Sequence, residues 1–530
     1  MTRRFRPLAL VLLVAGCGPR SAGVPLIPDL GSHHVAISSR NEQAQAYFDQ
    51  GVRLSYAFNH GEAVRAFREA RRLDPACAIC AWGEALAHGP NINLPMDSAA
   101  AGAAWRAIGE ARRLSSRASD RERDLIDALA QRYAADVTTP QAPRDSAYAR
   151  AMRALLDKYP DDREIATLYA ESVMDLSPWD YWDPEGNPKD EMAEALSRLE
   201  NVIAADPAHP GACHFYIHAV EAVYPDRAVA CAERLATAMP GAGHLVHMPA
   251  HIYVRVGRYA DAVQANIHAT HADSSYLQID RRAGFYDVGY VPHNHHFLAF
   301  AASIAGMRAV TIDAAREAAR KTGIEGARLA LETEYVLPGP QLYMTTFGMW
   351  DSVLAEPMPP ADLPLARGLA VYARGAALAA TGQVRESRAE LESLRAMAAG
   401  APEGTRRQLL MLAAYALCGE IAVREDLWDE AERQLREAAA IEDALPYMEP
   451  PYWHHPVRHA LGAALLAAGK PREAEQVYRA ALARFPENGW ALAGLRQSLA
   501  AQGRQAEAAG VAERLGAAWK SADVPAPGGP

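Results

Sequence analysis

Residues 46–75 read AYFDQGVRLSYAFNHGEAVRAFREARRLDP, and residues 459–486 read HALGAALLAAGKPREAEQVYRAALARFP. Both stretches place a glycine first, an alanine 12 residues later, an aromatic residue at 16, a second alanine at 19 and a proline at 24. These positions are Gly51, Ala63, Phe67, Ala70 and Pro75 in the first stretch, and Gly462, Ala474, Tyr478, Ala481 and Pro486 in the second. Small residues let two paired helices approach closely, the aromatic ring fills the space between helices, and proline ends the second helix. The spacing therefore predicts a repeated pair of helices.

This spacing resembles that of the tetratricopeptide repeat. Weaker copies occupy residues 195–207, 228–240, 257–269 and 419–438. Together the copies cover most of residues 40–516, as roughly nine or ten units. No stretch alternates apolar and polar residues as a half-buried strand would. We therefore expect an all-α fold, and the resemblance implies a right-handed α-solenoid.

The first residues carry the pattern of an export signal. Three arginines in MTRRFRP precede the apolar run LALVLLVAG, which is too short to span a bilayer. We predict that residues 1–16 form a signal peptide. The run ends in VAGC, which resembles a bacterial lipobox, so Cys17 is the expected lipidated residue; a chance cysteine after an ordinary signal is the alternative. The predicted location is the bacterial cell envelope, on the periplasmic or surface side of a membrane that holds the chain by its lipid.

Composition and repeat content divide the rest of the chain. The expected segments are a flexible tether over residues 17–35, a first solenoid with a histidine-rich groove over 36–335, a proline-rich connection over 336–364, a second solenoid over 365–516 and a disordered tail over 517–530. Of the 530 residues, 50% are hydrophobic and 22% are charged, which is typical of globular proteins. The formal net charge of −10 and the lack of a basic block argue against nucleic acid as a partner.

Histidines are concentrated in one part of the chain, since 11 of the 18 fall within residues 209–296. HFYIHAVE and GHLVHMPAH space their side chains to share one helix face, and both precede the second helix of a repeat. In a tetratricopeptide solenoid these first helices line the concave surface, so the two should lie side by side. The candidate metal ligands are His214, His218, Glu221, His244, His247, His251, His293 and His295. Imidazole and carboxylate ligands suit zinc, copper or iron.

Two functions remain open at this stage. One is a membrane-anchored scaffold whose histidine-rich groove binds a transition metal and a ligand. The other is an interaction scaffold that binds a peptide or partner protein, with no metal and no catalysis, in which the histidines pack as polar aromatic side chains. No HExxH sequence is present to indicate a familiar metalloenzyme.

Four further histidines are candidates for lining the groove. His60 and His88 fall in the first two repeats, and His60 follows Asn59 at a turn, where helix capping is the alternative. His454 and His455 fall in EPPYWHHPVRHALG, which is either a helix-entry loop packed by aromatic side chains or a lid facing the first histidine group.

The cysteines allow several pairings. Cys77 and Cys80 are one helical turn apart, which suits a local disulfide, a redox pair or two small buried residues. Cys213 and Cys231 fall on the two helices of one repeat and could also pair.

Several stretches together resemble a group of bacterial exported tetratricopeptide proteins. They are AFNHGEAVRAFREA, DPACAICAWG, GPNIN, GHLVHMPAHIYVRVGRYADAVQAN, HNHHFL, EPPYWHHPVRHALG and FPENGWALAGL. The resemblance spans most of the chain, but it implies only the repeat fold, with no activity to carry over to particular residues.

Overall fold

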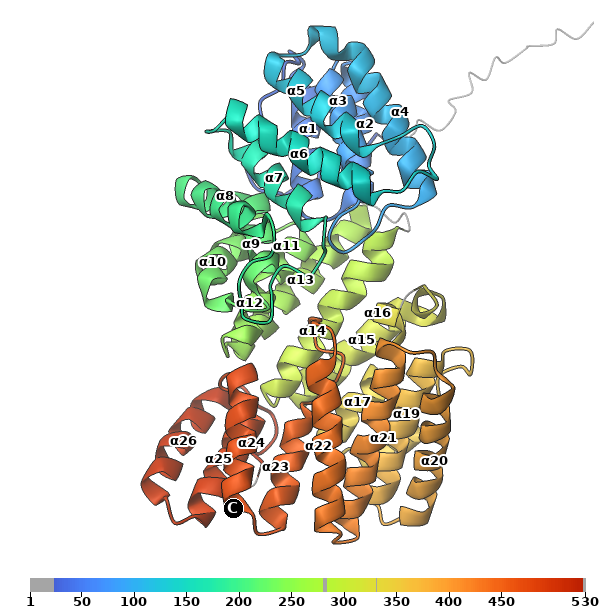
Figure 1. Ribbon diagram of the computed structural model, residues 1–530, viewed down its shortest axis with the longest axis vertical. Coiled ribbons are helices and arrows are strands. Elements are labelled where there is room, and N and C mark those ends of the chain that lie inside the picture. The colour runs from blue at the N-terminus through green and yellow to red at the C-terminus, as the bar shows by residue number, and fades with distance from the viewer. Residues whose placement is uncertain (1–22, 280–283, 330, 528–530) are drawn as a thin grey trace, which may run out of the picture.

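The computed structural model describes residues 23–279, 284–329 and 331–527. The expected signal peptide and Cys17 lie outside the described residues. Within them the chain is helical, and its only extended pairings are two isolated bridges, Asn91 with Leu94 and Trp182 with Pro188. The all-α, tetratricopeptide-type solenoid is confirmed (Figure 1). No helix of the described chain combines the length and apolar character needed to cross a membrane.

The first half of the chain forms the upper part of Figure 1. Its helices are α1 (Glu42–Tyr56), α2 (His60–Leu73), α3 (Ala78–Ala87), α4 (Ser98–Leu114), η1 (Ser115–Arg117), α5 (Asp120–Leu129), η2 (Ala130–Arg132), α6 (Ala142–Lys158), α7 (Arg163–Met174), α8 (Met192–Ala205), α9 (Pro210–Val220), η3 (Pro225–Ala228), α10 (Val229–Ala238), α11 (Gly243–His247), α12 (Pro249–Arg255) and α13 (Tyr259–Ile279).

The second half forms the lower part of Figure 1, and α14 lies between the two parts. Its helices are the π-helical η4 (Tyr286–Tyr290), α14 (Val291–Ile304), α15 (Arg308–Ala327), α16 (Leu331–Glu334), α17 (Gly339–Thr346), α18 (Trp350–Ala355), α19 (Pro364–Ala380), α20 (Val384–Gly400), α21 (Thr405–Arg424), α22 (Trp428–Ala444), α23 (Val457–Ala467), α24 (Pro471–Arg484), α25 (Gly489–Ala501) and α26 (Gln505–Ala518). The last helices pack against α14. Trp490 Nε1 on α25 donates a hydrogen bond to the Ser303 carbonyl of α14 at 2.9 Å.

The repeat spacing has a direct structural cause. Phe67 is fully buried on α2, and its ring lies so close to Gly51 on α1 and Gly83 on α3 that a Cβ atom at either glycine would overlap it. Tyr478 on α24 has the same relation to Gly462 on α23 and to a glycine on α25. The aromatic residue of one helix therefore packs between the glycines of two successive first helices, which fixes how neighbouring repeats stack.

Residues 336–364 differ from the predicted proline-rich connection. They form α17 and α18, and α17 packs between α15 and α19 as part of the solenoid. Proline at the first or second position of a helix does not interrupt it, which explains how a proline-rich stretch is helical here.

The described part of the tail, residues 517–527, is packed, in contrast to the predicted disorder. Trp519 contacts the turn at Gly306, and its indole nitrogen donates to the Val524 carbonyl at 2.8 Å. The Asp523 carboxylate accepts hydrogen bonds from the backbone amides of Arg308 and Ala309, at 2.6 and 2.8 Å. It thus caps the N-terminus of α15, whose first amides have no partner within the helix.

Candidate metal centre

Four helices of the first half and its junction bring the central histidines together. His214 and His218 lie on α9, His244 and His247 on α11, His251 on α12 and His293 on α14. Pro249 separates α11 from α12, so the three histidines of GHLVHMPAH follow two short helical segments rather than one continuous helix. The disulfide between Cys213 and Cys231 ties α9 to α10 beside this group. All these histidines are buried except His293, which is half-buried.

The first group, which we call the His247 trio, consists of His247, His251 and His293. The Nε2 atom of His247 lies 2.8 Å from Nε2 of His251 and 3.1 Å from Nε2 of His293. The Nδ1 atom of His247 lies 2.7 Å from Asn266 Oδ1, while the Asn266 amide donates to the Ala262 carbonyl at 2.8 Å. Three imidazole nitrogens thus converge on one point from three helices.

The hydrogen bonds on the far side of these rings assign their protons. His247 Nδ1 faces an amide oxygen, and His251 Nδ1 faces Glu221 Oε2 at 2.5 Å. Because both partners only accept, each Nδ1 carries the proton and each Nε2 carries a lone pair. Two lone pairs that face each other at 2.8 Å repel unless a proton or a cation lies between them. Such an arrangement could hold a metal ion through imidazoles that their outer partners orient.

The second group, the His214 trio, consists of His214, His218 and His244. His214 Nδ1 donates to the Tyr56 carbonyl at 2.6 Å, and His218 Nδ1 donates to Glu221 Oε1 at 2.9 Å. Within the described chain, Nε2 of both rings and both ring nitrogens of His244 are buried without a hydrogen-bond partner. One nitrogen from each of the three rings lies within 4.8 Å of the others.

Glu221 joins the two trios, with one carboxylate oxygen on each. Its side chain is fully buried. Burial alone would raise its pKa, but the charge of His251 and the hydrogen bonds from His218 and His251 lower it to about 2. The carboxylate is therefore ionised and orients an imidazole in each trio.

Burial favours the neutral form of five of these histidines, which is the form that binds metals. Burial lowers the pKa of His214, His244, His247 and His293 well below the usual 6.5. Burial also lowers the pKa of His218.

A buried polar network fixes α11 relative to α13 and α14. The His244 amide donates to the Tyr286 hydroxyl at 3.1 Å, and that hydroxyl donates to Asp273 at 2.8 Å. Asn294 on α14 donates to the other Asp273 oxygen, also at 2.8 Å. A Cβ atom at Gly243 would overlap the Asp273 carboxylate, so glycine is required there for this approach. The network sets the positions from which His244 and His293 extend.

Aromatic side chains surround the cluster. The ring centre of Phe58 lies 4.4 Å from that of His214, and the ring centre of Tyr290 lies 4.5 Å from that of His244. Trp179 contacts His218 edge-on at 5.0 Å, and Phe297 contacts His247 at 4.9 Å. This apolar shell leaves the side of His293 as the more exposed part of the cluster.

The loop before α23 reaches the cluster from the second half. Tyr447 lies 6.4 Å from Trp179 between ring centres, and the Arg255 guanidinium lies 5.9 Å from the Tyr447 ring. His454 and His455 on the same loop do not reach it. They line a separate cavity of about 790 Å³ inside the second half, where His455 Nε2 lies 2.9 Å from His459 Nδ1. Tyr447 lies just before the stretch EPPYWHHPVRHALG, and His454 and His455 of that stretch do not face the first histidine group as the lid hypothesis expected.

Three other candidates also lie outside both trios. His295 lies two residues after His293 on α14. It interacts with Lys321 and Glu317 of α15, so it is not part of the cluster. His60 Nδ1 lies 3.4 Å from Asn91 Nδ2, and His88 Nε2 lies 3.4 Å from an Arg68 nitrogen. The expected turn before His60 is present, with Asn59 as the cap of α2.

Sequence reasoning missed the residues that hold the ligands. Asn266, at the aromatic position of the repeat copy over residues 257–269, contacts His247, and Asn294 contacts Asp273, but the sequence spacing reveals neither contact. Phe58 has a φ angle of 54°, which turns it toward the cluster from the loop between α1 and α2.

Within the described residues, the cysteines form the disulfides Cys77–Cys80 and Cys213–Cys231, and Cys418 is free.

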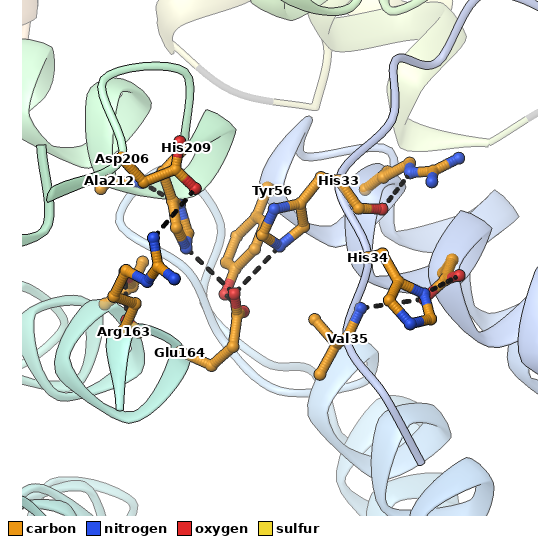
Figure 2. A network of polar contacts seen from close by, with 12 residues as sticks. His33, His34, Val35, Tyr56, Arg163, Glu164, Asp206, His209 and Ala212 are labelled. Atoms are coloured by element: carbon orange, nitrogen blue, oxygen red, sulfur yellow. Dashed lines mark hydrogen bonds and ion pairs between the residues drawn. The ribbon is translucent and has the colours of Figure 1, made fainter. Parts of the chain in front are cut away.

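A third histidine group lies near the N-terminus and is built around Glu164 (Figure 2). Glu164 Oε1 lies 3.0 Å from Nε2 of both His33 and His209, and Glu164 Oε2 accepts a hydrogen bond from the Tyr56 hydroxyl at 2.6 Å. His209 Nδ1 accepts from the Ala212 amide at 3.1 Å, as the cap of α9. Both nitrogens of His209 are therefore already engaged.

Comparisons with known proteins give a family match over part of the chain and distantly similar solved structures. Residues 465–518 match the tetratricopeptide repeat family. Solved structures similar to the chain include a human IFIT1 dimer with m7Gppp-AAAA, at 11% identity, 91% coverage of each chain and a TM-score of 0.35. Another is yeast Tom70, at 10% identity, 88% coverage of this chain, 90% of that chain and a TM-score of 0.30. No curated protein matches the chain. The family match places a tetratricopeptide repeat at residues 465–518, and the same glycine and aromatic packing recurs around Phe67 near the N-terminus.

Proposed function

We propose that this protein binds a transition metal ion at the His247 trio, within a lipid-anchored tetratricopeptide scaffold. The observation that carries the proposal is the pair of Nε2 atoms of His247 and His251, 2.8 Å apart and both assigned as lone-pair acceptors. His293 Nε2 supplies a third ligand atom 3.1 Å from His247 Nε2. Three imidazoles form the ligand set of a metal site that keeps one position for water or a further ligand.

The donor set narrows the choice of metal. Neutral imidazole suits zinc and copper, and three-nitrogen sites also hold iron(II). The outer partners Asn266 and Glu221 make the imidazoles better electron-pair donors to a metal and fix the orientation of the rings.

The metal test is elemental analysis of the chain produced without a histidine tag. We expect stoichiometric transition metal in the wild type and its loss from this trio in the variant His247→Ala with His251→Ala. The matched control, His454→Ala with His455→Ala, removes two histidines from the other half and should keep the metal. Far-UV circular dichroism should show unchanged helicity in both. A folded wild type that takes up no zinc or copper on reconstitution would overturn the proposal.

The repeat fold supports a role as a protein-interaction scaffold. The cavity of about 790 Å³ in the second half favours a peptide or protein partner, because aromatic rings of Tyr372, Trp453 and Trp490 line it. Cross-linking in membranes, compared between the wild type and Trp453→Ala, tests this function. Loss of a specific cross-linked partner in the variant is the expected result, and identical cross-links would count against it.

The sequence VAGC supports the proposed lipid anchor at Cys17. Replacing Cys17 with Ser should move the protein from the membrane fraction to the soluble fraction. A protein that stays with membranes after this change would argue against the anchor.

A further inference from the structure

We propose that the His214 trio binds a second metal ion, so that the cluster is a two-metal centre linked by Glu221. This inference rests on the proposed function of the His247 trio, and it assigns an additional site beside it.

The His214 trio presents nitrogen lone pairs that can bind a cation. His214 and His218 each use Nδ1 as a hydrogen-bond donor, to the Tyr56 carbonyl and to Glu221. Each therefore presents a lone pair at Nε2, which is buried with no hydrogen-bond partner in the described chain. A buried acceptor without a partner is unfavourable, so these two acceptors favour a bound cation.

His244 completes the set. Its side chain is 1% exposed, and neither ring nitrogen has a hydrogen-bond partner among the described residues. The backbone amide of His244, in contrast, is held by Tyr286. The chain thus fixes where this imidazole lies and leaves its nitrogens unused, which is the expected state of a ligand in the absence of its metal.

The two trios are adjacent. The ring centres of His218 and His251 lie 5.3 Å apart, and those of His244 and His247 lie 5.8 Å apart. Glu221 accepts from one imidazole of each trio through its two oxygens. The carboxylate places a buried negative charge beside the six imidazoles, which favours cations at both trios.

Two neighbouring ions can act on one small ligand together, which a single ion cannot do. The aromatic shell of Phe58, Tyr290 and Trp179 around the His214 trio keeps this volume apolar. The half-buried His293 leaves access from the side of the other trio.

The experiment counts ions and tests their coupling. The full chain without a histidine tag is stripped with chelator and reconstituted with zinc or with copper(II). Elemental analysis should give two zinc ions per chain in the wild type and one in His244→Ala. His293→Ala, which truncates the other trio, should keep the ion of the His214 trio. With copper(II), paramagnetic resonance should show a coupled pair in the wild type and an isolated ion in His244→Ala.

The outcomes separate the two proposals. One ion in both the wild type and His244→Ala overturns the second site and leaves the His247 site intact. No ion in the wild type overturns both. If His244→Ala fails to fold by circular dichroism, His244→Gln preserves the side-chain volume better and gives the same test. An uncoupled copper signal from two bound ions would overturn the linked centre.

Discussion

The central cluster and the N-terminal group of His33, Glu164 and His209 both place histidines around a glutamate, yet their hydrogen bonds leave different ring nitrogens without a partner. In the N-terminal group, His209 donates from Nε2 to Glu164 and accepts at Nδ1 from the Ala212 amide (Figure 2). The lone pair of His209 therefore already accepts a hydrogen bond from the protein. In the central cluster, His214 and His218 donate from Nδ1 and keep an unpartnered Nε2 within the described chain.

The difference separates structural histidines from candidate ligands. In both groups, the histidine nitrogens and carboxylate oxygens that could bind a metal lie within 4.8 Å of one another, so this distance alone does not separate the groups. In the N-terminal group both ring nitrogens of His209 are engaged by the protein, whereas the central cluster has lone pairs facing each other. The glutamates also differ, since Glu164 accepts from three side chains and Glu221 accepts from one imidazole of each trio.

The largest expected effect comes from Glu221→Gln. Glutamine offers one acceptor and one amide donor, so either His218 or His251 meets a donor and moves its proton to Nε2. That imidazole then has no lone pair for the metal. We expect about a 10–100-fold loss of zinc affinity, measured by competition with a chromophoric chelator. An unchanged affinity would show that Glu221 does not orient the ligands.

The matched change in the other group, Glu164→Gln, should affect stability and not metal. It replaces an acceptor of three hydrogen bonds, from Tyr56, His33 and His209, by a group that cannot accept all of them. We expect a loss of about 1–3 kcal/mol in the free energy of unfolding. Denaturant titration measures this loss, and metal content should equal that of the wild type. A drop in metal content would place Glu164 in the metal centre.

Acid should remove that stability difference. Burial alone would raise the pKa of Glu164, but hydrogen bonds from His209 and His33 lower it well below its ordinary 4.5. A carboxyl with a lowered folded-state pKa stabilises the fold above its unfolded-state value, and this stabilisation is lost as pH falls through the folded-state value. The gap between wild type and Glu164→Gln should be full at neutral pH and shrink below about pH 4.5. A gap that widens in acid would contradict this sign.

Local spacing was enough to predict the helix pairs and the pairing of HFYIHAVE with GHLVHMPAH. Glycine and aromatic positions recur at fixed distances because each ring packs between two helices, as Phe67 does between Gly51 and Gly83. Such contacts lie within about one repeat of sequence, so a pattern can reveal them.

Contacts between distant parts of the chain could not be predicted in this way. Tyr56 supplies its carbonyl to His214 from 158 residues away. Asn266 stands at the aromatic position of the repeat copy at residues 257–269, but that position does not reveal its contact with His247. The tail is another example, since Asp523 caps α15 only because the solenoid returns its last helices to α14. Composition describes such a segment by its own residues and not by the surface it meets.

The smallest expected effect comes from His295→Ala, and it tests which face of α14 belongs to the cluster. Spacing placed His293 and His295 together as candidates, but a helix turns about 200° over two residues. His295 therefore faces α15, where it interacts with Lys321 and Glu317, while His293 Nε2 lies 3.1 Å from His247. His295→Ala should leave metal content unchanged and alter the free energy of unfolding by less than about 0.5 kcal/mol. His293→Ala, made in parallel, should weaken metal binding at the His247 trio. Equal effects of the two variants on zinc affinity would mean that α14 does not present one face to the cluster.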